Sequence, residues 1–255
     1  MKRKITAGLF FSLILLVCCA EKKGHIIPEE SVRKVVTHRV TEGETWKSIA
    51  DDFYKEPERA EALALYNGSE KGDNPRPGSG VRVPLSEDDI DAIEDDLEAS
   101  RRYNTGLKLV SEGNYAEAIN NFQKVLKLDR SLYDASFNLG VTYQRLGLHK
   151  NAIVVLRDLS VRVKDNPEYL FALGNSLFHT GEIEDAKRTF RRVLDIDSSH
   201  LKSIYSLAVI YEKEGDKNKA EEMWQRYLEL DSSSDWADNA RSHLDAIRQS
   251  GGEGN

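Results

Sequence analysis

The sequence predicts a mainly α-helical chain: a small strand–helix–helix–strand module followed by an α-solenoid of four helix pairs and a C-terminal capping helix. Two patterns support this prediction. A 34-residue repeat runs through the second half of the chain, and a strand-like, two-helix, strand-like pattern occupies residues 36–85. Repeats of this length stack into solenoids, because one unit alone cannot bury its hydrophobic face. With 255 residues, 40% of them hydrophobic and 31% charged, the chain is long enough for two such units.

The N-terminus has the composition of a secretory signal peptide. Three basic residues at positions 2–4 precede an apolar stretch over residues 5–20, which is shorter than the roughly 20 residues of a membrane-spanning helix. The sequence Leu16-Val17-Cys18-Cys19 resembles the lipobox of bacterial lipoproteins. That resemblance implies a signal peptide over residues 1–18 and lipid attachment at Cys19. Ordinary cleavage after Ala20 and an uncleaved anchor are the alternatives.

The charge of the chain argues against nucleic-acid binding. It contains 36 Lys and Arg against 43 Asp and Glu, and removal of residues 1–18, with three basic and no acidic residues, leaves a net charge of −10. Eight of the acids lie between residues 85 and 99, and no basic stripe is present to neutralise phosphates. Ile90, Ile93 and Leu97 recur at helical spacing within this acidic run, which predicts a short amphipathic linker helix over residues 86–98.

The small module begins with a strand-like segment over residues 35–40. A first helical pattern covers residues 46–53, and a second begins near Pro57 and stops at the pair Asn67-Gly68, a typical helix end. Residues 81–84 alternate as a second short strand after a loop rich in Gly and Pro. Trp46 is expected to pack in the core, because aromatic residues at helical spacing usually face the core; a sugar-stacking platform is the alternative.

Four segments of this module together resemble LysM: His38-Arg39-Val40, Gly43-Glu44-Thr45, Leu65-Tyr66-Asn67 and Val81-Arg82-Val83-Pro84. The resemblance implies recognition of N-acetylglucosamine-containing polymers, in bacteria chiefly peptidoglycan. The family's shallow groove lies between the first strand–helix loop and the second helix–strand loop. Carried over to this chain, its glycan-binding residues are Gly43, Glu44, Thr45, Asn67, Gly68 and Ser69.

The 34-residue repeat aligns without a gap in four registers: 99–132, 133–166, 167–200 and 201–234. Position 8 is always small (Gly106, Gly140, Gly174 and Ala208), position 15 is always glycine (Gly113, Gly147, Gly181 and Gly215), and position 24 is always bulky (Phe122, Leu156, Phe190 and Trp224). Small residues let two helices approach closely, and glycine ends the first helix where φ is positive. The pattern resembles the tetratricopeptide repeat, a helix–turn–helix unit. Ser160 departs from the leucine found at position 28 of the other repeats.

Repeats of this family bind partners on the concave face formed by their first helices, which implies a partner groove in this chain. An aromatic row at position 5 would supply apolar anchors for a peptide, and nearby charges would set its register. Aromatic residues at this position also support neighbouring helices, which is the alternative for each of them. The predicted groove residues are Tyr103, Leu107, Phe137, Val141, Gln144, Arg145, Phe171, Asn175, Phe178, His179, Tyr205, Val209, Glu212 and Lys213.

The remaining segments complete the predicted domain organisation. Residues 19–35 are expected to form a tether, residues 235–249 a capping helix and residues 250–255 a disordered tail. The capping helix carries Ala237, Ala240 and Leu244 on one face, which would cover the exposed end of the solenoid.

The sequence contains no nucleophile constellation, phosphate loop or metal-ligand spacing, so we expect no catalytic residue, metal site or cofactor. The leading hypothesis is an envelope lipoprotein, anchored in the outer membrane and facing the periplasm, that binds peptidoglycan and recruits a protein for envelope assembly, division, secretion or pilus machinery. A structural wall tether whose repeats self-associate is the rival, and a LysM-linked cell-wall enzyme is a remote alternative.

Overall fold

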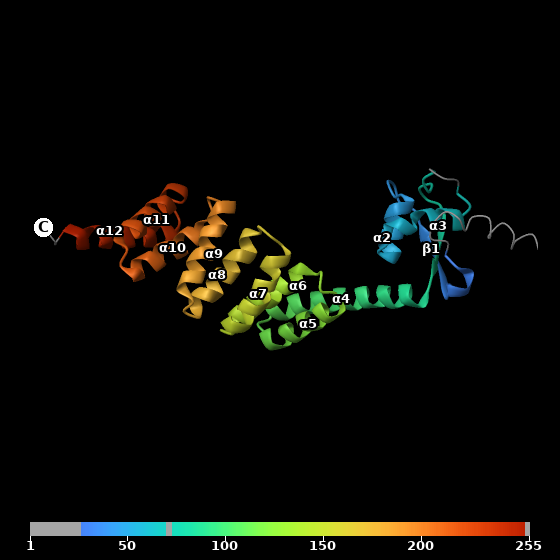
Figure 1. Ribbon diagram of the computed structural model, residues 1–255, viewed down its shortest axis with the longest axis horizontal. Coiled ribbons are helices and arrows are strands. Elements are labelled where there is room, and N and C mark those ends of the chain that lie inside the picture. The colour runs from blue at the N-terminus through green and yellow to red at the C-terminus, as the bar shows by residue number, and fades with distance from the viewer. Residues whose placement is uncertain (1–26, 70–72, 253–255) are drawn as a thin grey trace, which may run out of the picture. The chain divides into compact units, whose positions relative to one another are not determined.

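The computed structural model describes residues 27–69 and 73–252 (Figure 1). The chain divides into two compact units, Met1–Asp96 and Leu97–Asn255. Eleven α-helices and one two-stranded sheet lie within the described ranges, which confirms the mainly helical prediction and the presence of a small sheet. None of these helices is both long and apolar enough to cross a membrane. The predicted lipid-attachment residue Cys19 lies outside the described residues.

The N-terminal unit is built around an antiparallel pair of strands, β1 (Lys34–Arg39) and β2 (Gly80–Leu85), with Val36 opposite Val83. The short 3₁₀ helix η1 (Glu29–Ser31) precedes β1. Between the strands lie α2 (Trp46–Tyr54), η2 (Pro57–Arg59) and α3 (Ala60–Tyr66). This is the strand–helix–helix–strand order expected from the sequence.

The core of this unit lies between the helices and one face of the sheet. Ile49, Leu63 and Val83 have no exposed surface, and Trp46 is buried beside them. The Tyr54 hydroxyl donates a hydrogen bond of 3.0 Å to the Pro84 carbonyl, which fixes α2 against β2. Burial of these apolar side chains is the main source of stability for so small a unit.

Helix α4 (Glu87–Ser111) begins in the small unit and continues through the acidic segment into the first repeat. Its first turn is tied to the small unit by a bidentate ion pair, in which Arg59 donates to Asp89 at 2.7 and 3.2 Å. Ile90 and Ile93 pack against the core of the same unit. Residues 86–98 are therefore no separate linker helix: α4 runs on without a break into the first repeat, and its first turns pack on the small unit.

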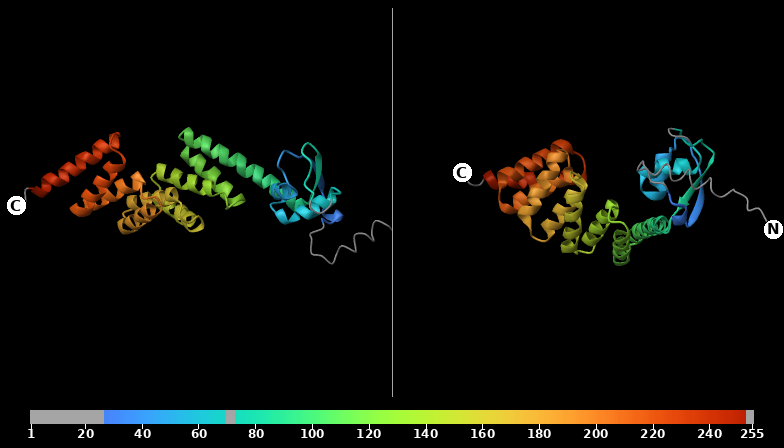
Figure 2. Two further views of the ribbon diagram at one scale, coloured as in Figure 1. Left: turned by 90° about the horizontal axis from the view of Figure 1, so that it is seen from above. Right: turned by 45° about the vertical axis from the view of Figure 1, so that its right-hand side comes forward.

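The second unit is a solenoid of helix pairs in the predicted register (Figures 1 and 2). The second half of α4 pairs with α5 (Tyr115–Leu128), and α6 (Tyr133–Arg145) pairs with α7 (His149–Arg162). Next come α8 (Pro167–His179) with α9 (Ile183–Ile196), and α10 (Leu201–Glu214) with α11 (Lys217–Leu230). The final helix, α12 (Asp235–Gly252), packs on α11.

Each repeat is held together by a contact between position 8 and position 24. A Cβ atom built on Gly174 would lie 2.7 Å from the Phe190 ring, and one on Gly140 would lie 2.6 Å from Leu156. Real Cβ atoms do not approach other atoms so closely, so a larger residue at Gly140 or Gly174 would force the facing side chain or the helices to shift. The geometry agrees with the expectation that a small residue at position 8 lets the two helices of a repeat approach closely.

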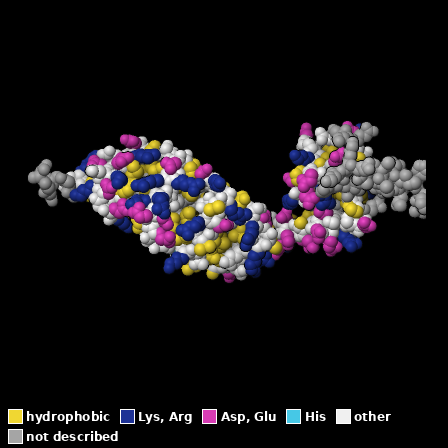
Figure 3. Space-filling model, viewed as in Figure 1, with side chains coloured by type: hydrophobic (Ala, Val, Ile, Leu, Met, Phe, Trp, Pro, Cys, Tyr) yellow, Lys and Arg dark blue, Asp and Glu magenta, His cyan; other side chains and the backbone are white. Residues whose placement is uncertain are grey.

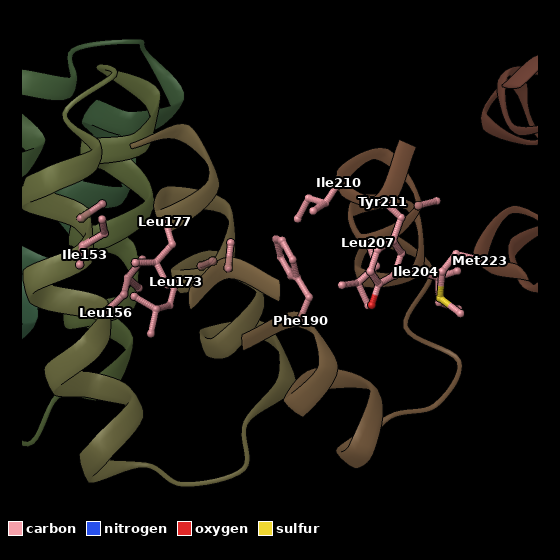
Figure 4. Close-up of a cluster of buried hydrophobic side chains, with 14 of the residues drawn as sticks. Ile153, Leu156, Leu173, Leu177, Phe190, Ile204, Leu207, Ile210, Tyr211 and Met223 are labelled. Carbon is pink, nitrogen blue, oxygen red and sulfur yellow. The ribbon is translucent and has the colours of Figure 1, made fainter. Parts of the chain in front are cut away.

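One hydrophobic core continues from repeat to repeat. Figure 4 shows Phe190 between Leu173 and Leu177 of its own repeat and Leu207 and Ile210 of the next repeat. The departure at Ser160 leaves no unsatisfied polar atom there, because its buried hydroxyl donates to the Arg157 carbonyl at 2.8 Å.

Candidate functional site

The repeat unit contains a cavity of about 620 Å³ between successive repeats and the last helix. We call it the aromatic cavity, because its wall includes Phe171, Phe178, Tyr205 and Trp236 together with Val209. A volume of this size is in the range of pockets that bind organic ligands. The side chain of Trp236 is 61% exposed, which is unusual for a residue of that size.

A second cavity, of about 550 Å³, shares Asn175 and His179 with the first. We call it the basic cavity, because its lining includes Arg145, His149 and His179 and contains no Asp or Glu. Tyr115, Val141 and Gln144 complete the lining. On the face of the repeat unit seen in Figure 3, Lys and Arg side chains lie among hydrophobic and acidic ones, and Asp and Glu also gather along the start of α4.

Packing within each repeat and against the next helix positions the aromatic side chains. The Phe171 ring lies 5.7 Å from that of Phe190, and the Tyr205 ring lies 4.9 Å from Trp224 and 5.1 Å from Trp236, all centroid to centroid. The Tyr205 hydroxyl also donates to Asn239 of α12 at 2.6 Å. These rings therefore brace neighbouring helices and line the cavity at the same time.

Nine of the fourteen groove residues predicted from the sequence line the two cavities: Phe171, Asn175, Phe178, His179, Tyr205, Val209, Val141, Gln144 and Arg145. Among them, the Gln144 amide is already used, since it donates to the Ala172 carbonyl at 2.6 Å and to the Ser176 hydroxyl at 2.7 Å.

The other five predicted residues line neither cavity. Tyr103 accepts a hydrogen bond from Asn138 at 3.0 Å, and Phe137 packs on Tyr169 with the ring centroids 5.0 Å apart, so both serve the packing of helices. The carboxylate of Glu212 is bound by His243 and Trp224. The remaining two are Leu107, which is partly exposed, and Lys213, whose ammonium lies 4.9 Å from the centre of the Phe178 ring.

The sequence reasoning missed ten of the lining residues, among them Tyr115, His149, Lys202 and Trp236. Lys202 is at position 2 of its repeat, and Trp236 is at position 2 of a fifth register that starts at residue 235. Position 2 projects into the groove in this repeat family, so extending the register beyond residue 234 would have found Trp236. Tyr115 and His149 begin second helices, whose first residues the sequence reasoning did not consider.

In the small unit, the first predicted glycan-binding loop is held by its own hydrogen bonds. The Glu44 carboxylate accepts from the Thr41 backbone N–H and from His38 at 2.9 Å. These bonds lower the pKa of Glu44, the backbone bond most and the His38 bond next. Thr45 is the N-cap of α2 and forms a reciprocal capping box with Ser48.

The second predicted loop is anchored in the same way. The Asn67 amide donates to the carbonyls of Leu63 and Arg82 at 2.9 and 2.8 Å, and its oxygen accepts from the Arg82 N–H at 2.7 Å. This side chain therefore joins the end of α3 to β2. Gly68 follows with a φ of +72°, a conformation that favours glycine.

Between these two loops lies a cavity of about 300 Å³, which we call the loop cavity. Thr45 and Ser69 line it, together with Trp46 and the 60% exposed Leu65. The other predicted glycan-binding residues, Gly43, Glu44, Asn67 and Gly68, do not line it. The Trp46 Nε1 atom is buried and has no hydrogen-bond partner among the residues that the structure describes.

Comparison with known proteins identifies the repeat. Family models described as TPR repeat and tetratricopeptide repeat match residues 98–147, 167–200 and 201–234. The protein O-mannosyl-transferase TMTC3 of Homo sapiens is 28% identical over 156 residues, which are 61% of this chain. The chain spans only 17% of the length of that relative.

Two crystal structures share the fold of the repeat unit. The MamA protein is 23% identical, with a TM-score of 0.52 over 60% of this chain and 87% of MamA. YrrB, described as a TPR protein with an unusual peptide-binding site, is 21% identical, with a TM-score of 0.53 over 77% of this chain and 90% of YrrB. The C-terminal unit of this chain is therefore an array of tetratricopeptide repeats.

Proposed function

We propose that this chain is a non-catalytic adaptor of the bacterial envelope. A lipid at Cys19 would hold it in the outer membrane facing the periplasm, residues 36–85 would bind peptidoglycan as a LysM module, and the repeats would recruit a protein. The observation that carries the proposal is the aromatic cavity with the exposed Trp236 at its edge. Tryptophan and tyrosine beside a pocket are the side chains that most often dominate protein interfaces.

An extended segment of a protein suits the groove better than a compact surface. The aromatic and basic cavities share two residues and together receive side chains from all four repeats and from α12. A peptide lying across several repeats can place successive side chains in both cavities. The peptide-binding site of YrrB is a property of that protein, and the shared fold makes a similar mode of binding reasonable to test here.

A photo-crosslinking residue at Ser206, which lines the aromatic cavity, tests recruitment directly. In envelope fractions we expect adducts with a second protein from Ser206 and none from Ser242, an exposed serine of α12 outside both cavities. Adducts formed only between copies of this chain would contradict the adaptor and support the self-associating tether.

The glycan part of the proposal is supported by the loop cavity, which lies between the two loops expected to hold sugars. Leu65 offers an exposed apolar side chain there, suited to the flat face of a sugar ring. We expect the chain to sediment with purified peptidoglycan and Leu65→Gln to weaken this about fivefold, corresponding to about 1 kcal/mol of lost apolar contact.

Val35→Thr is the matched control, because Val35 is an exposed apolar residue of the same unit that does not line the loop cavity. It should sediment as the parent does. Substitution of Thr45 or Asn67 is a poorer test, because both side chains hold the fold and their loss would confuse binding with stability. Sedimentation of residues 97–255 alone to the same extent would overturn the assignment of glycan binding to the small unit.

A further inference from the structure

We propose that the groove of the repeats selects an acidic peptide segment, with apolar side chains in the aromatic cavity and a carboxylate side chain in the basic cavity. This inference rests on the proposed recruitment of a protein by the repeats and adds the chemistry of the partner. Three observations carry it: the sign of the charges around the groove, the unused polar groups of the basic cavity and the stacked histidine pair.

The cations at the two cavities are unpaired. Arg145, Lys202 and Lys213 form no ion pair within the described ranges, although Lys202 and Lys213 lie over the rings of Phe171 and Phe178. Asp231, the acid among the lining residues of the two cavities, is already occupied. Asp231 accepts from the backbone N–H groups of Ser233 and Ser234, from the Ser234 hydroxyl and from Tyr227.

The second nearby acid, Glu212, is held between the His243 ring at 2.9 Å and the Trp224 indole at 3.3 Å. The cations around the groove are therefore unpaired and these two acids are paired, although the chain as a whole has a net charge of −7. Opposite charges on a partner speed encounter and fix its register, and like charges exclude it. The charge pattern favours an acidic partner over a basic one.

The basic cavity holds polar groups that the fold does not use. The side chains of Tyr115, Arg145 and Asn175 make no hydrogen bond in the part of the chain that the structure describes, and all three can donate. No carboxylate lines the cavity to compete for them. A bound carboxylate would accept from several of these donors at once, and Arg145 would add a charge-assisted bond.

The histidine pair adds a charge that depends on pH. The rings of His149 and His179 stack with centroids 4.5 Å apart and planes 15° from parallel, and the buried Nδ1 atom of His149 has no partner among the described residues. Burial, and next the neighbouring His179, lower the pKa of His149. A carboxylate bound at the edge of the stacked pair would favour the protonated form of His149, since it offsets the charge repulsion that lowers this pKa.

The titratable and charged groups that face this pair are Tyr115 from α5 and Arg145 from α6, while the histidines themselves come from α7 and α8. Because none of them is an acid, protonation at low pH can only raise the positive charge of the cavity. Binding of an anion should therefore strengthen as pH falls from about 7.5 to about 5.5, toward the lowered pKa of His149.

The test uses the whole chain without residues 1–18 and three fluorescein-labelled peptides of twelve residues. All three peptides share one half, which is rich in Trp, Phe and Leu. The other half carries Asp and Glu in the acidic peptide, Asn and Gln in the amide peptide, and Lys in the Lys peptide. Fluorescence anisotropy should give at least tenfold tighter binding for the acidic peptide than for the amide peptide. Affinity for the acidic peptide should rise at pH 5.5, and His149→Gln should flatten this response.

Arg145→Glu should lower the affinity for the acidic peptide about tenfold or more and should allow the Lys peptide to bind. Lys164→Glu, the same charge change at an exposed residue outside both cavities, should alter neither affinity. Thermal unfolding of both variants checks that the exposed substitutions spare the fold. The inference would be overturned if the acidic and amide peptides bound with equal affinity, or if none of the three peptides bound. The crosslinks from Ser206 would still decide separately whether the repeats recruit a protein.

Discussion

Trp224→Ala is expected to lower the free energy of unfolding of the repeat unit by about 3–5 kcal/mol, the usual loss for a buried aromatic side chain. Trp224 has no exposed surface, and its ring stacks on His243 at 4.9 Å and meets Tyr205 edge-on at 4.9 Å. The substitution leaves a cavity between the last repeat and α12. It also removes the indole donor from the Glu212 carboxylate. Urea unfolding followed by far-ultraviolet circular dichroism measures the loss.

Trp236→Ala is the matched control, because it deletes the same side chain one helix later at a position that is 61% exposed. Its free energy of unfolding should fall by only about 0.5–1.5 kcal/mol, the usual contribution of one aromatic pair, because Trp236 is largely exposed and packs on Tyr205 alone among the described rings. Similar losses from the two variants would mean that Trp224 is not the core residue of the last repeat. Because Trp236 lines the aromatic cavity, the control should still lose crosslinking to a partner.

Asp89→Asn is expected to lower the stability of the small unit by about 3 kcal/mol, because a buried ion pair that loses one member leaves an uncompensated charge. The side chain of Arg59 is 14% exposed and that of Asp89 is 8% exposed, so water cannot replace the missing partner. The same substitution weakens the cap of α4, where Asp89 and Ser86 exchange hydrogen bonds. Hydrogen exchange of the amides in α2 and β2 reports the stability of this unit.

The stability from Asp89 should also depend on pH. Burial raises the pKa of Asp89, but hydrogen bonds from Arg59 and Ser86 outweigh burial, so the folded pKa lies below the ordinary value. Asp89 then contributes its full share of the free energy of unfolding above about pH 4, the pKa of an unfolded aspartate. This contribution is lost as the pH falls through the lowered pKa of Asp89 in the folded state. Asp88→Asn, at the exposed neighbour, should change neither stability nor pH dependence. A parent whose small unit is equally stable at pH 7 and pH 2.5 would contradict the argument.

The sequence predicted the repeats more accurately than the site. Recurring residues such as Gly174 and Phe190 report a local contact within one repeat, and 34 residues contain both partners. The groove depends on contacts between repeats and on what else each side chain touches. Phe137 belongs to the aromatic row, yet it packs on Tyr169, and periodicity alone cannot distinguish the two roles.

The small unit illustrates the same limit. The loops carrying Glu44 and Asn67 could be located from the order of elements, but the hydrogen bonds that occupy both side chains join residues up to 15 positions apart. Asp89 seemed to belong to a solvated acidic run, because nothing in the local pattern indicates that Arg59 lies beside it. Pairings over such separations are set by the tertiary fold.

The contact between positions 8 and 24 bears on how such a chain can be recombined. The pair is Gly with Phe in the first and third repeats, Gly with Leu in the second, and Ala with Trp in the fourth. A crossover at residue 132, 166 or 200 transfers both members together, whereas one placed between the two helices of a repeat would separate them. Chimeras and duplications that respect the boundaries of the repeats therefore preserve a fitted pair, and whole repeats are the natural unit by which an array of this kind is lengthened, shortened or exchanged.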